Sequence, residues 1–445
     1  MAIDNPSSLD GAPLLTAQFD EKIQEVWLDG LRGIAAFLVF VYHFQHQFHQ
    51  AYNLGYGSKG GDNDHWIIQL PIIRLLVIGG PMVSIFWVLS GIALSLKPIQ
   101  LARSHAWDKF FETMYSAVFR RWLRLYLPCL VVQTCVIMTN LIGLFDYAFE
   151  LHEDWPFAGT KEKQQKKMET RLAQLGDWVK EMWAFMNPFH PMRPGYDSHL
   201  WTIQYEFRNS IVLFAALVGV AKLKARIRLT LILALYLYCV VVEQGDIALF
   251  IAGIGLAEFL VLRDQSKKAL PSAEPTKPER DGGQSIRART AWTIVLIVGL
   301  HLLSYPAWNF KTSWGYVTIT QLTPSFIKNV ELSWQRVGAA VLLLALCGSD
   351  YLRKPFSTPL AVYLGKISFP LYIIHGPIVH ILGYRLVPFF WNIVGNATLF
   401  QYELGLVLAF VVQLVVVVWL ADLVMRTVDT PSVRLGRTLQ TWWSV

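Results

Sequence analysis

Long hydrophobic runs alternate with short polar segments over almost the whole chain. A helix needs about 20 mostly apolar residues to cross the ~30 Å hydrocarbon core of a bilayer. Between two of the runs, residues 243–246 fit either a tight turn or a break within one long helix. The pattern predicts an all-α polytopic membrane protein with about ten transmembrane helices around an intramembrane cavity. We expect these helices to centre on 31–49, 71–96, 124–144, 199–221, 229–243, 246–262, 291–307, 335–349, 359–384 and 402–424.

The distribution of Lys and Arg predicts the orientation of these helices. With ten spans and a cytoplasmic N-terminus, the cytoplasmic segments contain 25 Lys and Arg residues, and the opposite side contains 12. Seven of those 12 lie in one long loop, 145–198, where the positive-inside rule is weak. Both termini are therefore predicted to be cytoplasmic.

Composition supports a membrane protein, because 54% of the residues are hydrophobic and only 16% are charged. The net charge of +7 does not indicate nucleic-acid binding, since the Lys and Arg residues lie between apolar runs instead of forming one face. All four cysteines lie inside apolar runs, so we expect no disulfide and no metal site. These cysteines are Cys129, Cys135, Cys239 and Cys347.

The polar segments divide the chain into one membrane domain and two short ends. Residues 1–26 are polar and lack the features of a cleaved signal, so the first span is expected to direct membrane insertion. The membrane domain covers 27–428, and 429–445 is predicted to be a cytoplasmic tail. Within the domain, 263–289 has the Lys, Pro and Gly content of a disordered cytoplasmic linker.

The loop 145–198 has stronger structure signals than the other loops. Residues 161–186 could form an amphipathic helix, which a Pro- and Gly-rich stretch would then end. We expect this loop to cap the membrane domain on the lumenal side.

The first span contains two polar residues with related positions. Arg32 and His43 are 11 residues apart, close to three helical turns, so they share a face and are separated by about 16 Å along the axis. Polar groups inside a span are functional candidates. The spacing is equally consistent with an arginine that reaches the headgroups and a histidine satisfied within the interior.

Three further segments place polar side chains near or inside spans. Arg121 and Arg124 are one turn apart and can form a cationic pocket for phosphate, although a positive-inside anchor is the simpler explanation. Glu206 can act in acid–base chemistry or form a structural ion pair. Tyr372 and His375 are one turn apart and can face one cavity, although a kink at a nearby proline also explains the pattern.

These segments, in this order, resemble the membrane-bound acyltransferase family 3, the O-antigen acetylase type. Residues 28–35 followed by His43 resemble the opening Arg and His motif of the family. Segment 86–91 is similar to its second-helix signature, 121–124 to its Arg-x-x-Arg motif, and 364–375 to its late Gly-Ser-Tyr-His segment. Four matches in order make the resemblance specific.

One family segment differs in this chain. The usual Trp-Ser-x-x-x-Glu-Glu stretch is represented by Trp201, Thr202 and Glu206, and Phe207 follows where the second acid would stand. This variant is the one expected of a fungal-like branch.

The resemblance implies an acyl-CoA donor, with acetyl-CoA expected, that approaches from the cytoplasm, and no bound cofactor. It implies that Arg32, Arg121 and Arg124 hold the phosphates of CoA. His43 would be the general base or would itself carry the acyl group, and Glu206 would orient it or balance an arginine. Five other residues are expected to line the substrate pocket: Ser90, Trp201, Tyr205, Tyr372 and His375.

The acceptor is not encoded in any recognisable motif. A free-standing membrane domain of this branch favours a small hydroxylated lipophile, such as a terpenoid or polyketide of secondary metabolism, and an endoplasmic reticulum or related endomembrane location. The rival class is a multi-pass metabolite transporter, because charged residues inside spans also mark transport paths. We find no repeated halves, which many transporters contain.

Overall fold

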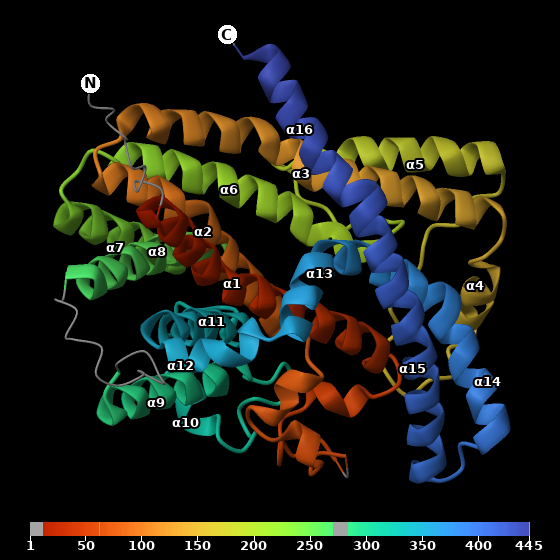
Figure 1. Cartoon of the computed structure of the whole chain (residues 1–445). Helices are drawn as coiled ribbons and strands as arrows, with labels where there is room; N and C mark the ends of the chain where they lie inside the picture. The colour runs from red at the N-terminus through yellow and green to blue at the C-terminus, as the bar shows by residue number, and fades with distance from the viewer. Residues whose placement is uncertain (1–11, 62, 270–283, 445) are drawn as a thin grey trace, which may run out of the picture.

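A computed structural model describes residues 12–61, 63–269 and 284–444 (Figure 1). Within these ranges the chain consists of α-helices joined by loops and short 3-10 or π-helical turns, and the one β pairing described is an isolated bridge between Leu54 and Trp308. The helices are α1 (Ala12–Gln45), α2 (Gly80–Arg103), α3 (Trp107–Leu141), α4 (Asp146–Glu153), α5 (Arg171–Phe185), α6 (Trp201–Val220), α7 (Ala225–Val241), α8 (Gly245–Ala269), α9 (Ile286–Leu303), α10 (Val317–Gln321), α11 (Val330–Gly348), α12 (Asp350–Arg353), α13 (Pro359–Ile378), α14 (Tyr384–Val394), α15 (Leu399–Val424) and α16 (Thr430–Trp443).

The predicted all-α membrane architecture is confirmed. Eight helical stretches of the described residues are long and apolar enough to cross a bilayer: α1, α2, α3, α8, α9, α11, α13 continued into α14, and α15 continued into α16. Helices α6 and α7 occupy two more of the predicted runs but do not belong to this set. The chain is a multi-pass membrane protein, whereas ten crossings and two cytoplasmic termini stay predictions.

Helices α1 and α13 form the centre of the molecule. In Figure 1, α3, α5 and α6 lie across the top, α9 to α12 lie at the lower left, and α14 and α15 lie at the right of this pair. Glycines allow α1 and α13 to touch, because a Cβ on Gly33 would lie 2.2 Å from the backbone nitrogen of Gly365. This contact places the polar start of the first span beside the segment 364–369.

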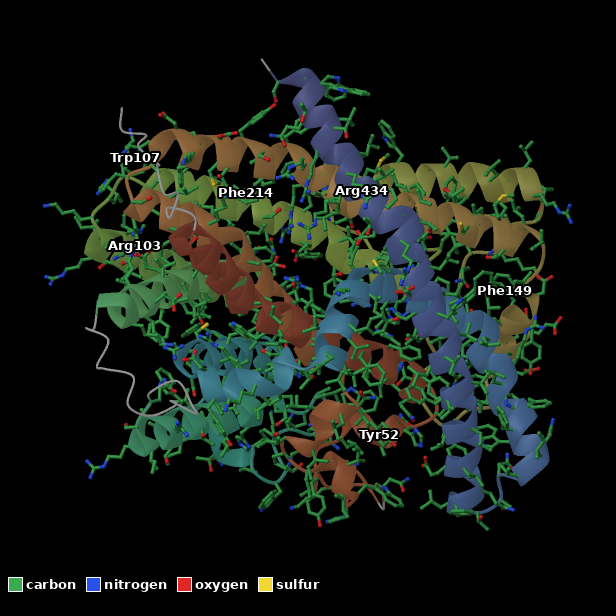
Figure 2. All side chains as sticks on the ribbon, viewed as in Figure 1. Tyr52, Arg103, Trp107, Phe149, Phe214 and Arg434 are labelled. Carbon is green, nitrogen blue, oxygen red and sulfur yellow. The ribbon has the colours of Figure 1, made fainter. Side chains whose placement is uncertain are left out.

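Side chains fill the space between the helices (Figure 2). On the side of α2, α7 and α8, the fully buried carboxylate of Glu258 accepts hydrogen bonds from Arg103 and Arg228, each at 2.7 Å. A buried acid of this kind is stable only when it is paired, so these arginines have a structural role.

One predicted helix boundary differs in the structure, and one of two open alternatives is decided. The predicted run 71–96 becomes α-helical only at Gly80, because the preceding residues form a short 3-10 turn around buried Arg74, which donates hydrogen bonds to the carbonyls of Tyr52 and Ser304. The ambiguous segment 243–246 contains a turn that separates α7 from α8, with Glu243 at a φ of 59° and α8 beginning at Gly245.

The long loop contains less helix than predicted. Of the expected helix 161–186, only α5 is helical, and residues 161–168 run without regular structure. Buried Gln174 holds this stretch, because its side chain contacts the backbone of Lys166 and Met168 and the hydroxyl of Tyr196. The backbone is thereby satisfied by side chains in place of helical hydrogen bonds. Most of the predicted linker 263–289 lies outside the described residues.

Candidate active site

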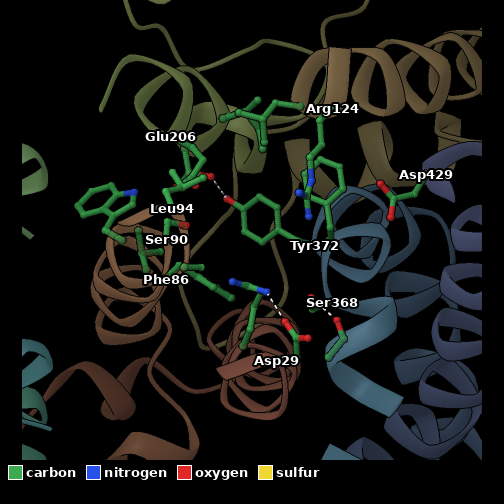
Figure 3. Close-up of a pocket in the computed structure, with 18 of the residues that line it drawn as sticks. Asp29, Phe86, Ser90, Leu94, Arg124, Glu206, Ser368, Tyr372 and Asp429 are labelled. Atoms are coloured by element: carbon green, nitrogen blue, oxygen red, sulfur yellow. Dashed lines mark hydrogen bonds and ion pairs between the residues drawn. The ribbon is translucent and has the colours of Figure 1, made fainter. Parts of the chain in front are cut away.

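A cavity of about 420 Å³ lies among α1, α2, α3, α6 and α13. Its lining combines charged and aromatic side chains. Figure 3 shows Arg124, Glu206 and Tyr372 directed toward this space, and Asp29 bonded to Arg32 below it. The predicted residues that line the cavity are Arg32, Ser90, Arg121, Arg124, Glu206 and Tyr372. Side chains from five helices thus meet where the sequence predicted a substrate pocket.

The three predicted phosphate-binding arginines differ in their partners. Arg32 donates to Asp29 at 2.7 Å, and both side chains are partly exposed. Arg121 is buried and donates to Glu206 at 2.6 Å and to Ser210 at 3.1 Å. Arg124 makes no hydrogen bond or ion pair with any residue that the structure describes, so its guanidinium is available to an anion in the cavity.

A second cavity of about 220 Å³ adjoins the first and shares Arg121 and Arg124 with it. It lies against α16, a helix within the predicted cytoplasmic tail 429–445. Its charged lining residues are all basic: Lys97, Arg120, Arg121, Arg124 and Arg437. The two cavities together form a path that becomes more cationic toward α16, which suits a polyanionic ligand. We call this second space the basic vestibule.

A hydrogen-bonded tyrosine, Tyr372, forms part of the wall of the first cavity. The Tyr372 hydroxyl donates to the carbonyl of His199 at 2.5 Å and lies 2.6 Å from the Thr202 hydroxyl. Tyr372 and Thr202 line the cavity, whereas none of its described lining residues is a histidine. Tyr372 therefore separates the arginines from the region that contains His43.

Beyond Tyr372, His43 lies against Glu162, a residue that was not predicted from the sequence. Its Nδ1 is 2.5 Å from Oε1 of Glu162, which comes from the long loop. Burial alone would raise the pKa of Glu162, but the neighbouring imidazoles of His199, His43 and His46 lower this pKa well below its usual range. The glutamate is therefore a carboxylate that accepts the proton on His43 Nδ1, which leaves Nε2 of His43 with a lone pair.

A second histidine, His199, is also held by carboxylates. Its Nδ1 lies 2.8 Å from Oδ1 of Asp197, and its Nε2 lies 3.1 Å from Nδ1 of His43 and 3.4 Å from Glu162. Asp197 is buried and accepts a further hydrogen bond from Gln133 at 3.3 Å. The position of the His199 ring is thus fixed from both sides.

Helix α13 and the turn that follows it each supply one further histidine. His375 directs Nδ1 to the Tyr372 carbonyl at 2.7 Å, while its buried Nε2 has no hydrogen-bond partner among the described residues. His380, in the π-helical turn that follows, contacts Oε2 of Glu162 at 2.9 Å. We define the histidine cluster as His43, His46, His199, His375, His380 and Glu162.

The loop reaches the cluster because it pairs with the end of α1. The backbone nitrogens of Gly159 and Thr160 donate to the carbonyls of Gln47 and His46, at 3.0 and 2.9 Å. These carbonyls follow the last turn of the helix and need such partners. A Cβ on Gly159 would lie 2.3 Å from Gln47, so this pairing requires glycine. Glu162 then enters the interior three residues later.

Three predicted pocket residues occupy other places. Trp201 and Tyr205 do not line the cavity but pack behind it on Trp87, with ring centroids 6.2 and 6.3 Å away. His375 faces the histidine cluster, with its ring centroid 5.1 Å from that of His43. Glu206 pairs with Arg121 and does not contact His43. The acid beside His43 is Glu162.

Sequence comparisons point to one enzyme class. The profile of the acyltransferase domain matches residues 25–426. The chain is 29% identical to the O-acetyltransferase PaAT-1 of Phomopsis amygdali over 92% of this chain and 83% of that protein. It is 24% identical to the acyltransferase clz18 of Cochliobolus lunatus, over 93% of this chain and 95% of that protein. It is also 24% identical to the acyltransferase R4 of a Phoma species, over 91% and 93%. No solved structure matches the chain significantly.

Proposed function

Since this chain belongs to the membrane-bound acyltransferase 3 family, we propose that it moves an acyl group, with acetyl expected, from acyl-CoA to a hydroxyl of a small lipophilic acceptor. The observation that carries the proposal is the pairing of His43 with Glu162 next to an arginine-lined cavity. The first feature can activate a hydroxyl, and the second can hold a polyphosphate donor.

The donor fits the cavity and the vestibule by charge and position. CoA carries phosphate groups at one end and the thioester at the other, joined by a long flexible arm. Among the described residues, Arg124 makes no hydrogen bond or ion pair, and Arg32 pairs only with a partly exposed acid. Guanidinium groups bind phosphate oxygens in a bidentate way. We place the phosphates near these arginines and the basic vestibule, and the thioester toward Tyr372.

The chemical step uses His43 as a general base. With Glu162 accepting from Nδ1, the Nε2 lone pair of His43 can take the proton of the acceptor hydroxyl. The acceptor oxygen then attacks the thioester carbonyl, the carbon–sulfur bond breaks, and the thiolate of CoA leaves with the electron pair. The proton on His43 returns to this thiolate. Tyr372 must shift for the thioester to meet His43, because it separates the two regions.

A relay is the second form of the same proposal. His43 could attack the thioester itself, carry the acyl group on Nε2 and pass it to an acceptor on the lumenal side. The place of the histidine cluster beyond Tyr372 favours neither order of events, since both require the donor to reach His43.

We extend the proposal to a role in secondary metabolism at an endomembrane. The support is the similarity to fungal acyltransferases, of which one is an O-acetyltransferase. A terpenoid or polyketide with a free hydroxyl is the acceptor class that we would test first.

The test uses yeast microsomes that contain the chain or its His43→Ala variant. Labelled acetyl-CoA and a panel of hydroxylated acceptors are supplied, and label in organic-soluble product is measured together with release of free CoA. We expect transfer by the wild type and a loss of at least about 100-fold in the variant. If folded wild-type protein neither binds nor consumes any acyl-CoA, the donor assignment is wrong and the transporter hypothesis becomes the better explanation.

A further inference from the structure

The histidine cluster has the geometry of a transition-metal site as well as that of a base. One ligand atom from each of His43, His199 and His375 lies within 4.8 Å of the other two. Four-coordinate zinc with bonds of about 2.0 Å places its ligand atoms roughly 3.3 Å apart. The nitrogens of His43 and His199 are already 3.1 Å apart, so little movement is needed.

The outer contacts of these imidazoles also fit metal ligation. In metalloproteins the second ring nitrogen of a ligating histidine usually donates to a carboxylate or a backbone carbonyl. His199 meets Asp197 at 2.8 Å in this way, and His375 meets the Tyr372 carbonyl at 2.7 Å. The remaining nitrogen of His375 is buried and has no hydrogen-bond partner among the residues described. Because Nδ1 donates to the Tyr372 carbonyl, this nitrogen of the neutral ring carries a lone pair.

Glu162 offers a carboxylate ligand beside two of these histidines. Its Oε1 lies 2.5 Å from the Nδ1 of His43 and 3.4 Å from the Nε2 of His199. Imidazole and carboxylate together suit Zn²⁺ and its neighbours in the first transition series. We propose that the histidine cluster binds a divalent transition-metal ion such as Zn²⁺ through His43, His199, His375 and Glu162, and that the bound ion inhibits acyl transfer.

The inhibition follows from the tautomer of one ring, and this part rests on the proposed function. An ion bound at Nδ1 of His43 displaces the proton that Glu162 accepts there. A neutral imidazole then carries its proton on Nε2, the atom that should accept the proton of the acceptor hydroxyl. The ion also uses the carboxylate that orients the ring. Donor binding is unaffected, because the arginine-lined cavity lies on the other side of Tyr372.

Metal binding is tested first, without any acyl-CoA. Purified protein is freed of metal with a chelator and titrated with Co²⁺, whose visible absorption reports tetrahedral coordination, and with Zn²⁺ followed by elemental analysis. We expect about one equivalent of tightly bound ion. His375→Gln should abolish this binding, whereas His49→Ala, at a histidine outside the cluster that is paired with Glu403, should retain it. The far-ultraviolet circular dichroism spectrum and the elution volume of each variant show whether it is folded.

Two results would overturn the metal site: no stoichiometric ion in the folded wild type, or equal binding by folded His375→Gln. The inhibitory role is then tested by acyl transfer at one equivalent of Zn²⁺. We expect a loss of at least about 100-fold that a chelator reverses, with acyl-CoA binding unchanged. Tight binding of the ion without loss of acyl transfer would refute the inhibitory role but not the metal site. Absence of any acyl transfer would refute the proposed function while the metal titration still stands.

Discussion

The arginine-lined cavity and the histidine cluster lie on opposite sides of Tyr372 and are built in different ways. The cavity is open, and its charged groups come from helices, with Arg124 unpaired among the described residues and Arg32 partly exposed. The cluster is largely buried, with only His43 partly exposed, and Glu162 contacts four histidines in it. An open site with free cations suits a ligand that arrives and leaves, whereas a largely buried site with paired groups suits a fixed proton acceptor.

This contrast assigns different kinetic roles to the two regions. Changes in the cluster should lower the rate of transfer and leave donor affinity intact. Changes in the cavity and vestibule should weaken donor binding and alter the maximal rate less. Each variant below separates these two effects, because donor binding and turnover can be measured independently.

The largest effect is expected from Gly376→Ala, which breaks the cluster without removing any of its polar groups. A Cβ on Gly376 would lie 2.1 Å from the ring of His199, which is anchored by Asp197 and Glu162. The ring must leave its present position between Asp197 and His43. We expect a stability loss of about 1–3 kcal/mol and a loss of transfer of at least about 100-fold. Thermal unfolding and labelled-acetyl transfer measure the two quantities.

The matched control is Gly219→Ala, on α6, where a Cβ meets no atom within 4 Å. It should transfer at the wild-type rate. If Gly376→Ala also keeps wild-type turnover, the position of His199 does not matter to the reaction.

The next largest effect is expected from Glu162→Gln, which should lower turnover about 10- to 100-fold and leave the affinity for acyl-CoA unchanged. The amide keeps the shape of the side chain but removes the negative charge that holds the proton on Nδ1 of His43. Glu206→Gln is the comparison on the cavity side, because it leaves Arg121 without its charged partner. That variant should alter donor affinity more than turnover. A reversal of the two profiles would exchange the roles that we give to the two acids.

The difference between the regions also explains what the sequence could predict. Arg32, Arg121, Arg124 and His43 lie in or beside apolar runs, where helix periodicity fixes their relative positions, and the family motifs mark them. Glu162 lies in a run of Lys, Glu and Gln that has the composition of an exposed segment. It is buried only because the loop pairs with the end of α1 and is held by Gln174.

The overall fold was more predictable than its details. Apolar length alone identified ten helices, all of which the structure contains among its described residues. It could not show that a predicted helix over 161–186 would begin only at Arg171, since the first half is stabilised by tertiary contacts. Nor could it show that α16 contributes Arg437 to the basic vestibule, because a short amphipathic end carries no signal of its packing partner.

On the donor side, Arg124→Ala should raise the KM for acyl-CoA about tenfold and change turnover less. The side chain makes no hydrogen bond or ion pair with a described residue, so its removal breaks no such contact, although Asp429 in the same cavity loses a neighbouring positive charge. A charge-assisted hydrogen bond contributes about 1.5–3 kcal/mol, and 1.4 kcal/mol corresponds to a factor of ten. Donor titration by microcalorimetry and steady-state kinetics measure the change. An unaltered KM would remove Arg124 from the phosphate site.

The smallest effect is expected from Arg437→Ala in the basic vestibule. Arg437 lies on α16, beyond the arginines of the deeper cavity, and meets solvent there. Exposed ion pairs contribute only about 0.2–1 kcal/mol, so KM for acyl-CoA should rise about two- to fivefold at low salt. Screening shortens the range of such interactions, so the difference from wild type should vanish near 1 M salt. A KM that is unchanged at low salt would mean that the donor phosphates bind only in the deeper cavity, around Arg32 and Arg124.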